Sequence, residues 1–499
     1  PASGFALDSQ THEVRVESTS TTRLDVSDAP QADPVTVVVA KIDAQTSAGT
    51  AQGDATLAGA EFTVRYYAGS YGSADELPGQ ATRTWVVATG ADGTASLDAN
   101  HLVSGDALYT NSAGDVVLPL GTVTVQETRA PRGYLVTDTS LHLQRVTSSG
   151  TLETVEAFVA PAVADEVVRG GVSVPKIDHE LAQGDATLAG AVISIVNASA
   201  APVLVNGAEH APGEEVMTIV TGADGTASTG ADALPYGTYR LVEKSAPEGY
   251  RLNATWSVTV SVQQDGQVVQ AQTLADEVVR GAAQVAKADA DLGESSAQGD
   301  ATLSGAEVSI YNRSESAVLV NGVLYQPGDV VARIVTDASG QAATEPRALP
   351  FGTYEARETA APAGYLVNEG WSQTFQVRED GQVVRLEGLS NAVARGGVVV
   401  RKADLDCGAS SPQGDATLAG AELTIYNQSA AAVVVGGHTY QVGEAVATVA
   451  TDESGEARSA ADALPFGTYE IRETAAPEGY LVNEGWSRTF EIRSHGQVA

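Results

Sequence analysis

The sequence AQGDATLAGA at residues 51–60 recurs unchanged at 182–191, as AQGDATLSGA at 297–306 and as PQGDATLAGA at 412–421. Each copy precedes a run of β-branched and aromatic residues such as Val308-Ser-Ile-Tyr311. Each block then closes with a Pro-x-Gly-Tyr sequence, which predicts a turn followed by another strand. Four copies spaced by about 110 residues predict tandem domains of one fold.

Short antiparallel strands are predicted between these markers. Asn206-Gly207 and Asn321-Gly322 each follow a valine-rich run, as expected for tight hairpin turns. No long segment has the periodicity of an amphipathic helix. The sequence therefore predicts an all-β chain with one immunoglobulin-like β-sandwich in each repeat.

The repeat markers also predict domain boundaries. The sequence is interpreted as containing three complete domains of an elongated array, at residues 34–168, 169–279 and 280–394. Residues 1–33 are interpreted as the last strands of a preceding sandwich, and residues 395–499 as a fourth domain without its last strand. The sequence is thus interpreted as a window from a longer repeat protein.

The composition argues against several classes of protein. The formal net charge is −35. Such a charge repels phosphate backbones and anionic lipid, so neither nucleic acid nor a membrane is expected as a partner. A single cysteine leaves no disulfide framework, and no apolar run reaches the length of a membrane span. Covalent reinforcement of this chain would need other chemistry.

Lysine is scarce, and its positions repeat. The chain has five lysines, of which four occupy one position of the repeat: Lys41, Lys176, Lys287 and Lys402. A valine lies two residues before each of them, and alternate residues of a strand face the same side. Each lysine is therefore predicted on the core-facing side of a strand. An unpaired buried ammonium is costly, so the group must lose its proton or find a partner.

Two further sets of polar residues have the same inward parity. The first set is Glu127, Glu243, Glu358 and Glu473. The second set lies about a dozen residues before the next lysine and consists of Asp165, Asp276 and Asn391. Each complete repeat is predicted to bury a cluster of lysine, glutamate, and aspartate or asparagine. A hydrogen-bonded ion network without covalent chemistry is the alternative interpretation.

These motifs resemble the collagen-adhesin B-type (CnaB-like), prealbumin-like domains of Gram-positive bacterial surface adhesins and pilins. The resemblance covers almost the whole chain. It rests on the Lys-x-Asp of each first strand, the following Gly-Ala strand and the Glu-x-x-Ala-Pro-x-Gly-Tyr box. In that family, the first-strand lysine joins a last-strand Asn or Asp through a spontaneous isopeptide bond assisted by the box glutamate. The resemblance therefore implies bonds between Lys41 and Asp165, Lys176 and Asp276, and Lys287 and Asn391, assisted by Glu127, Glu243 and Glu358.

The implied chemistry needs no cofactor or metal. Burial favours a neutral lysine amine and a protonated glutamate, which polarises the acceptor carbonyl and passes a proton to the leaving water or ammonia. Each site would react once, so the chain is not expected to be an enzyme with turnover. The acceptor strands read Ala-Asp-Glu-Val or Ser-Asn-Ala-Val, whereas the family more usually has Thr-Asn.

The resemblance implies an extracellular structural stalk of a cell-wall-anchored adhesin. Its expected partners are neighbouring domains of the same longer chain and a host surface ligand bound through regions outside this segment. The alternative is a pilin-like or head-to-tail fibre subunit, in which the half-sites Asp28 and Lys402 meet between chains. A third hypothesis is that one repeat binds a host glycan or matrix protein through the extra segment near Asn100 to Val117. The loops at Asp54, Asp185, Asp300 and Asp415 are interpreted as turns rather than calcium sites.

Overall fold

The computed structural model describes residues 4–6, 10–34, 37–148, 155–156, 158–181 and 183–499. Its elements are strands apart from one short 3-10 helix, η1 (Ala74–Glu76), which confirms the predicted all-β fold. No helix in this part of the chain is long and apolar enough to span a membrane. Two compact units are distinguished. The first comprises Pro1–Lys176, Ala189–Ala246 and Leu252–Leu274, and the second comprises Ile177–Leu188, Pro247–Arg251 and Ala275–Ala499.

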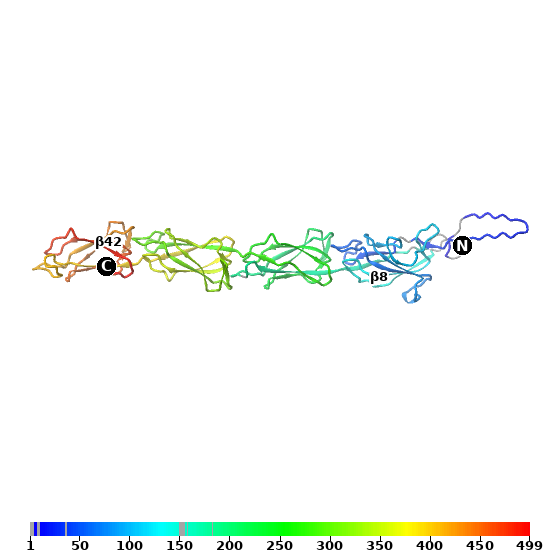
Figure 1. The fold of residues 1–499 in the computed structure, drawn as a ribbon, viewed down its shortest axis with the longest axis horizontal. Helices are drawn as coiled ribbons and strands as arrows, with labels where there is room; N and C mark the ends of the chain where they lie inside the picture. Colours follow the sequence, from blue (N-terminus) through cyan, green and yellow to red (C-terminus); the bar gives the residue numbers. More distant parts are fainter. Residues whose placement is uncertain (1–3, 7–9, 35–36, 149–154, 157, 182) are drawn as a thin grey trace. The chain divides into compact units, whose positions relative to one another are not determined.

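The first repeat is a sandwich of two sheets, with strand orders β11-β10-β8-β3-β4-β6 and β5-β2-β12-β9. Apolar side chains from both sheets, among them Val39, Trp85 and Val163, form one buried core. Figure 1 labels β8, which lies near the centre of the larger sheet. The strands are β1 (Ala32–Asp33), β2 (Val39–Asp43), β3 (Glu61–Tyr67), β4 (Arg83–Ala88), β5 (Thr94–Ala95), β6 (Leu102–Gly105), β7 (Leu118–Pro119), β8 (Gly121–Arg129), β9 (Tyr134–Leu135), β10 (His142–Ser148), β11 (Val155–Glu156) and β12 (Ala162–Val167).

The extra segment of the first repeat is only partly a loop. Its residues Leu102–Gly105 form β6, which pairs with β4 at the edge of the larger sheet. The chain then folds back, so that the Tyr109 ring meets the rings of Tyr66 and Trp85 edge to face. The Arg83 guanidinium lies 3.6 Å from the centre of the Tyr109 ring. Aromatic packing therefore holds this segment against the sandwich.

The second repeat contains an antiparallel sheet of order β17-β14-β20-β21 and a second sheet built around β13. The predicted Asn206-Gly207 turn is confirmed, because it joins β15 to β16 with φ of 52° and 78° at the two residues. The strands are β13 (Arg169–Asp178), β14 (Val192–Asn197), β15 (Val203–Val205), β16 (Ala208–His210), β17 (Glu215–Val220), β18 (Thr226–Ser228), β19 (Leu234–Pro235), β20 (Gly237–Ser245), β21 (Ser257–Val262), β22 (Val268–Gln270) and β23 (Leu274–Asp276).

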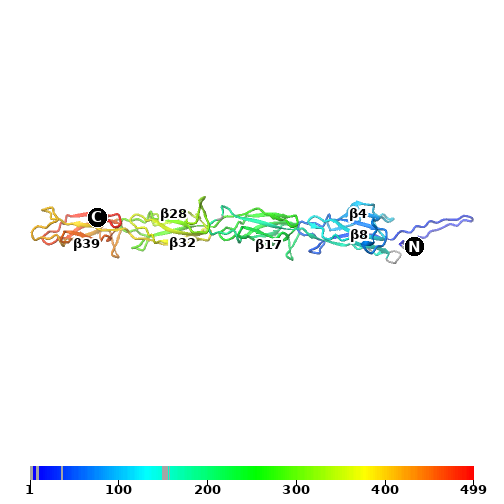
Figure 2. The same cartoon turned by 90° about the horizontal axis from the view of Figure 1, so that it is seen from below.

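The third repeat has the same plan, with the sheet β28-β25-β31-β32 facing a sheet built around β24. Figure 2 labels β28 and β32, the two edge strands of the first of these sheets. Asn321-Gly322 joins β26 to β27, as predicted. The strands are β24 (Arg280–Asp289), β25 (Glu307–Asn312), β26 (Val318–Val320), β27 (Val323–Tyr325), β28 (Val330–Val335), β29 (Gln341–Ala343), β30 (Leu349–Pro350), β31 (Gly352–Ala360), β32 (Ser372–Val377) and β33 (Val383–Asn391).

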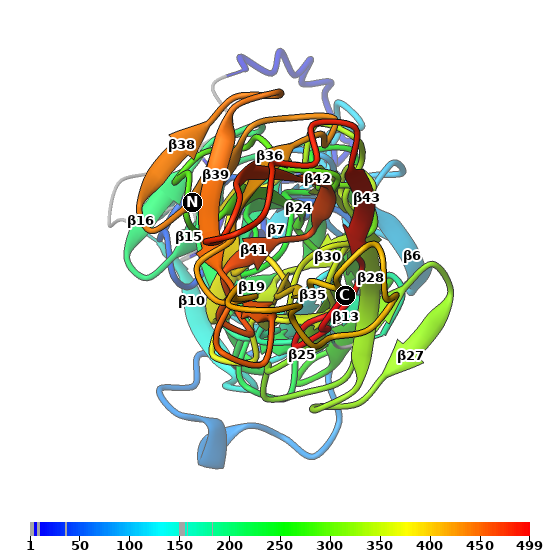
Figure 3. The same ribbon diagram turned by 90° about the vertical axis from the view of Figure 1, so that its left-hand side faces the viewer.

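The fourth repeat contains the corresponding sheet β39-β36-β42-β43, whose strands Figure 3 shows in orange and red. Its first two strands, β34 and β35, pair with β41 and β40 respectively. The strands are β34 (Arg395–Gly396), β35 (Val399–Arg401), β36 (Glu422–Asn427), β37 (Val433–Val435), β38 (His438–Tyr440), β39 (Ala445–Ala450), β40 (Glu456–Arg458), β41 (Leu464–Pro465), β42 (Gly467–Ala475) and β43 (Ser487–Ile492).

The first and last strands run parallel to each other in the first and third repeats. Lys41 of β2 is opposite Val163 of β12, and Lys287 of β24 is opposite Leu389 of β33. Residues two apart on a strand face the same side. The parallel register therefore puts Asp165 and Asn391, each two residues beyond the direct partner, on the same face as the lysine.

Candidate functional site: buried lysine clusters

The first cluster joins three strands. Lys41 lies on β2, Glu127 on β8 and Asp165 on β12, and all three side chains are fully buried. The Lys41 Nζ atom lies 2.7 Å from Glu127 Oε2 and 2.8 Å from Asp165 Oδ2. The fold thus brings the three residues together, with the amine in contact with both carboxylates.

Two carboxylates share the single ammonium of this cluster. Burial raises the pKa of Glu127 to about 7; the Lys41 ammonium opposes the rise, and the nearby Asp165 carboxylate adds to it. Glu127 therefore holds a proton near neutral pH far more readily than an exposed glutamate does. A carboxyl group that can hold or release a proton at this position is suited to proton transfer.

The second cluster contains a slightly longer contact. Lys176 on β13 and Glu243 on β20 have fully buried side chains, and Lys176 Nζ lies 3.6 Å from Glu243 Oε1. The other oxygen, Glu243 Oε2, accepts a hydrogen bond of 2.7 Å from the backbone N–H of Asn253. The predicted acceptor Asp276 is the last residue of β23 and is 1% exposed.

The third cluster contains an amide acceptor. Asn391 on β33 donates hydrogen bonds of 2.8 Å from Nδ2 to both carboxylate oxygens of Glu358 on β31. Lys287 on β24 is fully buried, and its Nζ donates to the carbonyl oxygen of Ala288 at 3.3 Å. Burial lowers the pKa of Lys287 to about 8, against the opposing effect of Glu358 and Asp289. The Lys287 amine is therefore more easily made neutral and nucleophilic than an exposed lysine.

The fourth repeat holds a lysine–glutamate pair beside a cavity. Lys402 Nζ lies 2.7 Å from Glu473 Oε1, and the two side chains are 14% and 4% exposed. A cavity of about 570 Å³ lies over the pair and is also lined by Leu423, Tyr480 and Trp486. In the first and third repeats, β12 and β33 pair with the first strand beside the lysine. The other predicted half-site residue, Asp28, lies in no strand.

The sequence reasoning missed a pair of residues that supports each cluster. The aspartate of the Lys-x-Asp motif accepts a hydrogen bond from the tyrosine hydroxyl that closes the Pro-x-Gly-Tyr turn. The pairs are Tyr134 with Asp43 at 2.8 Å, Tyr365 with Asp289 at 2.6 Å and Tyr480 with Asp404 at 2.7 Å. This bond ties the lysine strand to the turn that follows the glutamate strand. The recurrence of the Lys-x-Asp and Pro-x-Gly-Tyr motifs in every repeat was the available signal.

Comparisons with known proteins agree with this architecture. The family model described as SpaA, prealbumin-like fold domain, matches residues 36–157, 170–275, 291–390 and 410–499. No curated protein sequence matches the chain.

Several solved structures are similar to the chain at low sequence identity. The Bacillus anthracis TIE protein is 22% identical over 96% of this chain and 74% of its own length, with a TM-score of 0.45. The streptococcal ancillary pilin is 18% identical, with 72% and 99% covered and a TM-score of 0.22. BcpA, the major pilin subunit of Bacillus cereus, is 15% identical, with 66% and 97% covered and a TM-score of 0.24.

The four spans matched by the family model cover most of the 499 residues, and each contains one copy of the strand pattern described above. The tandem prealbumin-like fold predicted from the repeat motifs is therefore confirmed. The chain belongs to the SpaA prealbumin-like fold domain family and contains the domain in four tandem copies.

Proposed function

We propose that this chain is a structural stalk of an extracellular adhesin on the bacterial surface, strengthened by isopeptide bonds that its repeats form without an enzyme. The first cluster carries the proposal, because the buried Lys41 amine lies 2.8 Å from the Asp165 carboxylate and 2.7 Å from the Glu127 carboxyl group. Four tandem domains with this strand plan suit a load-bearing role, since each bond would join the first strand of a domain to its last.

In the first repeat, the reaction begins with transfer of a proton from the Lys41 ammonium to the cluster of carboxylates. The neutral Nζ attacks the Asp165 carboxyl carbon while protonated Glu127 donates a hydrogen bond to the carbonyl oxygen. The carbon–oxygen bond to the hydroxyl group breaks, and Glu127 carries the amine proton to it. The products are an amide and one water molecule, so no oxidant or metal is needed.

In the third repeat, the leaving group is ammonia. Lys287 Nζ attacks the Asn391 amide carbon, and Glu358 passes the amine proton to the departing nitrogen. In the structure, this Nδ2 atom already lies 2.8 Å from both Glu358 oxygens, within direct reach for proton transfer. The products are the Lys287–Asn391 amide and ammonia.

The first and third repeats are expected to show opposite pH dependences of bond formation. In the first repeat, the proton on Glu127 is lost as the pH rises through about 7, so the rate should fall above pH 7. In the third repeat, the neutral Lys287 amine becomes populated as the pH rises through about 8, so the rate should increase about tenfold between pH 6 and 7. The rates can be followed by peptide mass spectrometry after an unfolded, unbonded chain is refolded at each pH. The same pH trend in both repeats would contradict these roles.

A second candidate function is a fibre subunit whose fourth repeat accepts the last strand of another chain. The cavity beside Lys402 and Glu473 favours it, because the equivalent side of the first strand pairs with a last strand in the first and third repeats. In a fibre of this kind, the amine of Lys402 would bond to an acceptor residue of the second chain.

A synthetic peptide with the sequence of residues 385–394, which contains Asn391, is expected to attach covalently to Lys402. The chain mass should rise by the mass of the peptide less about 17 Da for the released ammonia. A peptide with Asn391→Ala and a chain with Lys402→Arg are the matched controls. A peptide of residues 22–33, which contains Asp28, tests the head-to-tail form. Absence of both adducts would remove the fibre function and leave the stalk proposal intact.

A further inference from the structure

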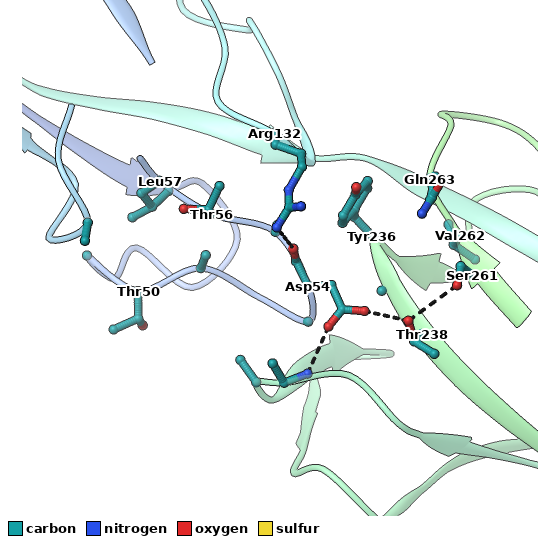
Figure 4. Close-up of a pocket in the computed structure, with 18 residues that line it drawn as sticks. Thr50, Asp54, Thr56, Leu57, Arg132, Tyr236, Thr238, Ser261, Val262 and Gln263 are labelled. Atoms are coloured by element: carbon teal, nitrogen blue, oxygen red, sulfur yellow. Dashed lines mark hydrogen bonds between the residues drawn. The ribbon is translucent and has the colours of Figure 1, made fainter. Parts of the chain in front are cut away.

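The Gln-Gly-Asp turn of the first repeat contacts the second repeat. Asp54 accepts a hydrogen bond of 3.0 Å from the backbone N–H of Ala200 and one of 2.7 Å from the Thr238 hydroxyl. Figure 4 shows both bonds converging on the Asp54 carboxylate. Gln52 Oε1 accepts a third bond, of 2.8 Å, from the backbone N–H of Leu204. All these residues belong to the first compact unit.

The same contacts recur twice inside the second compact unit. In the next copy, Asp185 accepts from the Glu315 N–H at 2.9 Å and the Thr353 hydroxyl at 2.7 Å, and Gln183 accepts from the Leu319 N–H at 3.1 Å. In the third, Asp300 accepts from the Ala430 N–H at 2.7 Å and the Thr468 hydroxyl at 2.6 Å, and Gln298 accepts from the Val434 N–H at 3.0 Å. Equivalent atoms meet at three places, so the motif is a repeated docking surface rather than a set of isolated turns.

The receiving side of this contact is a preformed Asn-x-Ser turn. The Asn197 side chain is fully buried; it accepts a hydrogen bond from the Ser199 N–H at 2.9 Å and donates one to the Ala201 carbonyl at 3.1 Å. These bonds hold the intervening Ala200 N–H toward Asp54. Asn312 and Asn427 are buried in the same way and hold the equivalent turns of the third and fourth repeats.

The described residues of the first repeat do not form a receiving side of this kind. Thr122 stands at the position of Thr238, but its hydroxyl donates to the Gly69 carbonyl at 2.7 Å and accepts from the Tyr71 N–H at 2.9 Å. The one donor of the Thr122 hydroxyl is therefore used inside its own repeat, where Thr122 is 0% exposed. The contact consequently has a direction, from the Gln-Gly-Asp turn of one repeat to the Asn-x-Ser turn of the next.

The fourth repeat presents the Gln-Gly-Asp turn on an exposed surface. Gln413 and Asp415 are exposed, whereas Gln52 and Gln298 are 3% and 0% exposed. Gln413 Nε2 nevertheless donates to Asp404 at 2.8 Å, as Gln52 does to Asp43 at 2.9 Å. The side chain is thus already held in the docking geometry, with its carbonyl oxygen available to a partner.

We propose that the Gln-Gly-Asp turn is a directional docking surface between repeats, and that Gln413 and Asp415 form the same surface for one further repeat of the receiving type. The partner would be a β-sandwich with a buried-asparagine Asn-x-Ser turn and a Gly-Thr-Tyr strand start. It would contribute two backbone N–H groups and one hydroxyl group. A second copy of this chain could not dock through its first repeat, because Thr122 is already engaged there.

Single Asp→Ala variants of the full chain test the docking surface. Each substitution removes the acceptor of one backbone N–H group in the next repeat. Hydrogen exchange at that group is expected to accelerate about five- to tenfold. The group is Ala200 for Asp54→Ala, Glu315 for Asp185→Ala and Ala430 for Asp300→Ala. Asp415→Ala is the matched control and should change none of them. Unchanged exchange in β14, β25 and β36 verifies folding. Equal effects of Asp415→Ala, or no acceleration in the other three variants, would overturn the proposal.

A substitution that adds a contact between the first and second repeats is a second test of the docking surface. Arg378 and Arg493 lie 3.1 and 2.9 Å from Asp185 and Asp300, but the first junction has Gln263 at this position and a cavity of about 660 Å³ (Figure 4). Gln263→Arg is expected to slow exchange at Ala200 about two- to fivefold, as one added ion pair would. Unchanged or faster exchange at Ala200 would argue against this geometry.

An extended chain tests the exposed surface of the fourth repeat. Appending a second copy of residues 385–499 after Ala499 supplies a last strand and a receiving repeat. In this chain, the added copy of the Ala430 amide is expected to be protected, and Asp415→Ala should accelerate its exchange as Asp300→Ala does at Ala430. If Asp415→Ala left the exchange rate of this amide unchanged, the assignment of Gln413 and Asp415 as a docking surface would be overturned. Isopeptide formation is measured separately by mass, so failure of docking leaves the stalk proposal untouched.

Discussion

Intact mass spectrometry of the matured chain is expected to give a mass about 53 Da below that calculated from the sequence, because two aspartate bonds each release water and one asparagine bond releases ammonia. The Lys41 amine and the Asp165 carboxylate already lie 2.8 Å apart, so little movement precedes the attack in the first repeat. Tryptic digestion should yield branched peptides that contain Lys41, Lys176 and Lys287.

Substitutions should remove these mass losses one at a time. Lys41→Ala is expected to regain about 18 Da and Lys287→Ala about 17 Da, beyond the change of the residue itself. Glu127→Gln should have the same effect as the loss of Lys41, because an amide cannot transfer the proton. Lys244→Ala is the matched lysine control, since its side chain is 56% exposed and pairs with Glu215 on the surface. A full calculated mass in the unmodified chain would leave the clusters as ion networks only.

Loss of the bond in the third repeat is expected to lower the free energy of unfolding of that repeat by about 5 kcal/mol. The Lys287–Asn391 bond would close a loop of roughly 100 residues, and the chain-entropy model gives this magnitude for a crosslink of that span. Such a loss is comparable with the whole stability of an ordinary domain. Asn391→Ala and Glu358→Gln remove the bond by different routes, so equal losses would assign the effect to the crosslink.

The tryptophans allow the repeats to be measured separately. The chain has four, Trp85, Trp256, Trp371 and Trp486, one in each repeat. Fluorine NMR of a fluorotryptophan-labelled chain therefore reports the unfolding of each repeat in one denaturant titration. Asn391→Ala should shift only the Trp371 transition, and the other three signals serve as internal controls. A loss near 1 kcal/mol, the usual contribution of a hydrogen bond, would mean that the bond does not form.

The sequence pattern predicted the buried faces well because burial is a local property of strands. Alternation around Lys41, Lys176 and Lys287 placed these lysines inward, and their side chains are buried in the structure. The hairpins at Asn206 and Asn321 followed from the same kind of rule, since Asn-Gly permits the positive φ that a tight turn needs. The extra segment of the first repeat was harder to predict, because the packing of Tyr109 on Tyr66 and Trp85 depends on residues far away in the sequence.

The sequence by itself determined the tandem all-β architecture and the inward direction of the lysine and glutamate side chains, because hydrophobic alternation and turn chemistry act between near neighbours. The family resemblance implied the pairing of Lys41 with Asp165, but only the tertiary structure decided its geometry and the contacts between repeats. The parallel register of β2 and β12 brings Asp165 to Lys41, and the contact of successive repeats gives Asp54 a partner 184 residues away in Thr238. Strand register and contacts between repeats depend on residues far apart in the sequence, which hydrophobic periodicity does not relate. The Gln-Gly-Asp motif, interpreted from the sequence as a turn, is therefore seen as a contact between repeats only in the folded structure.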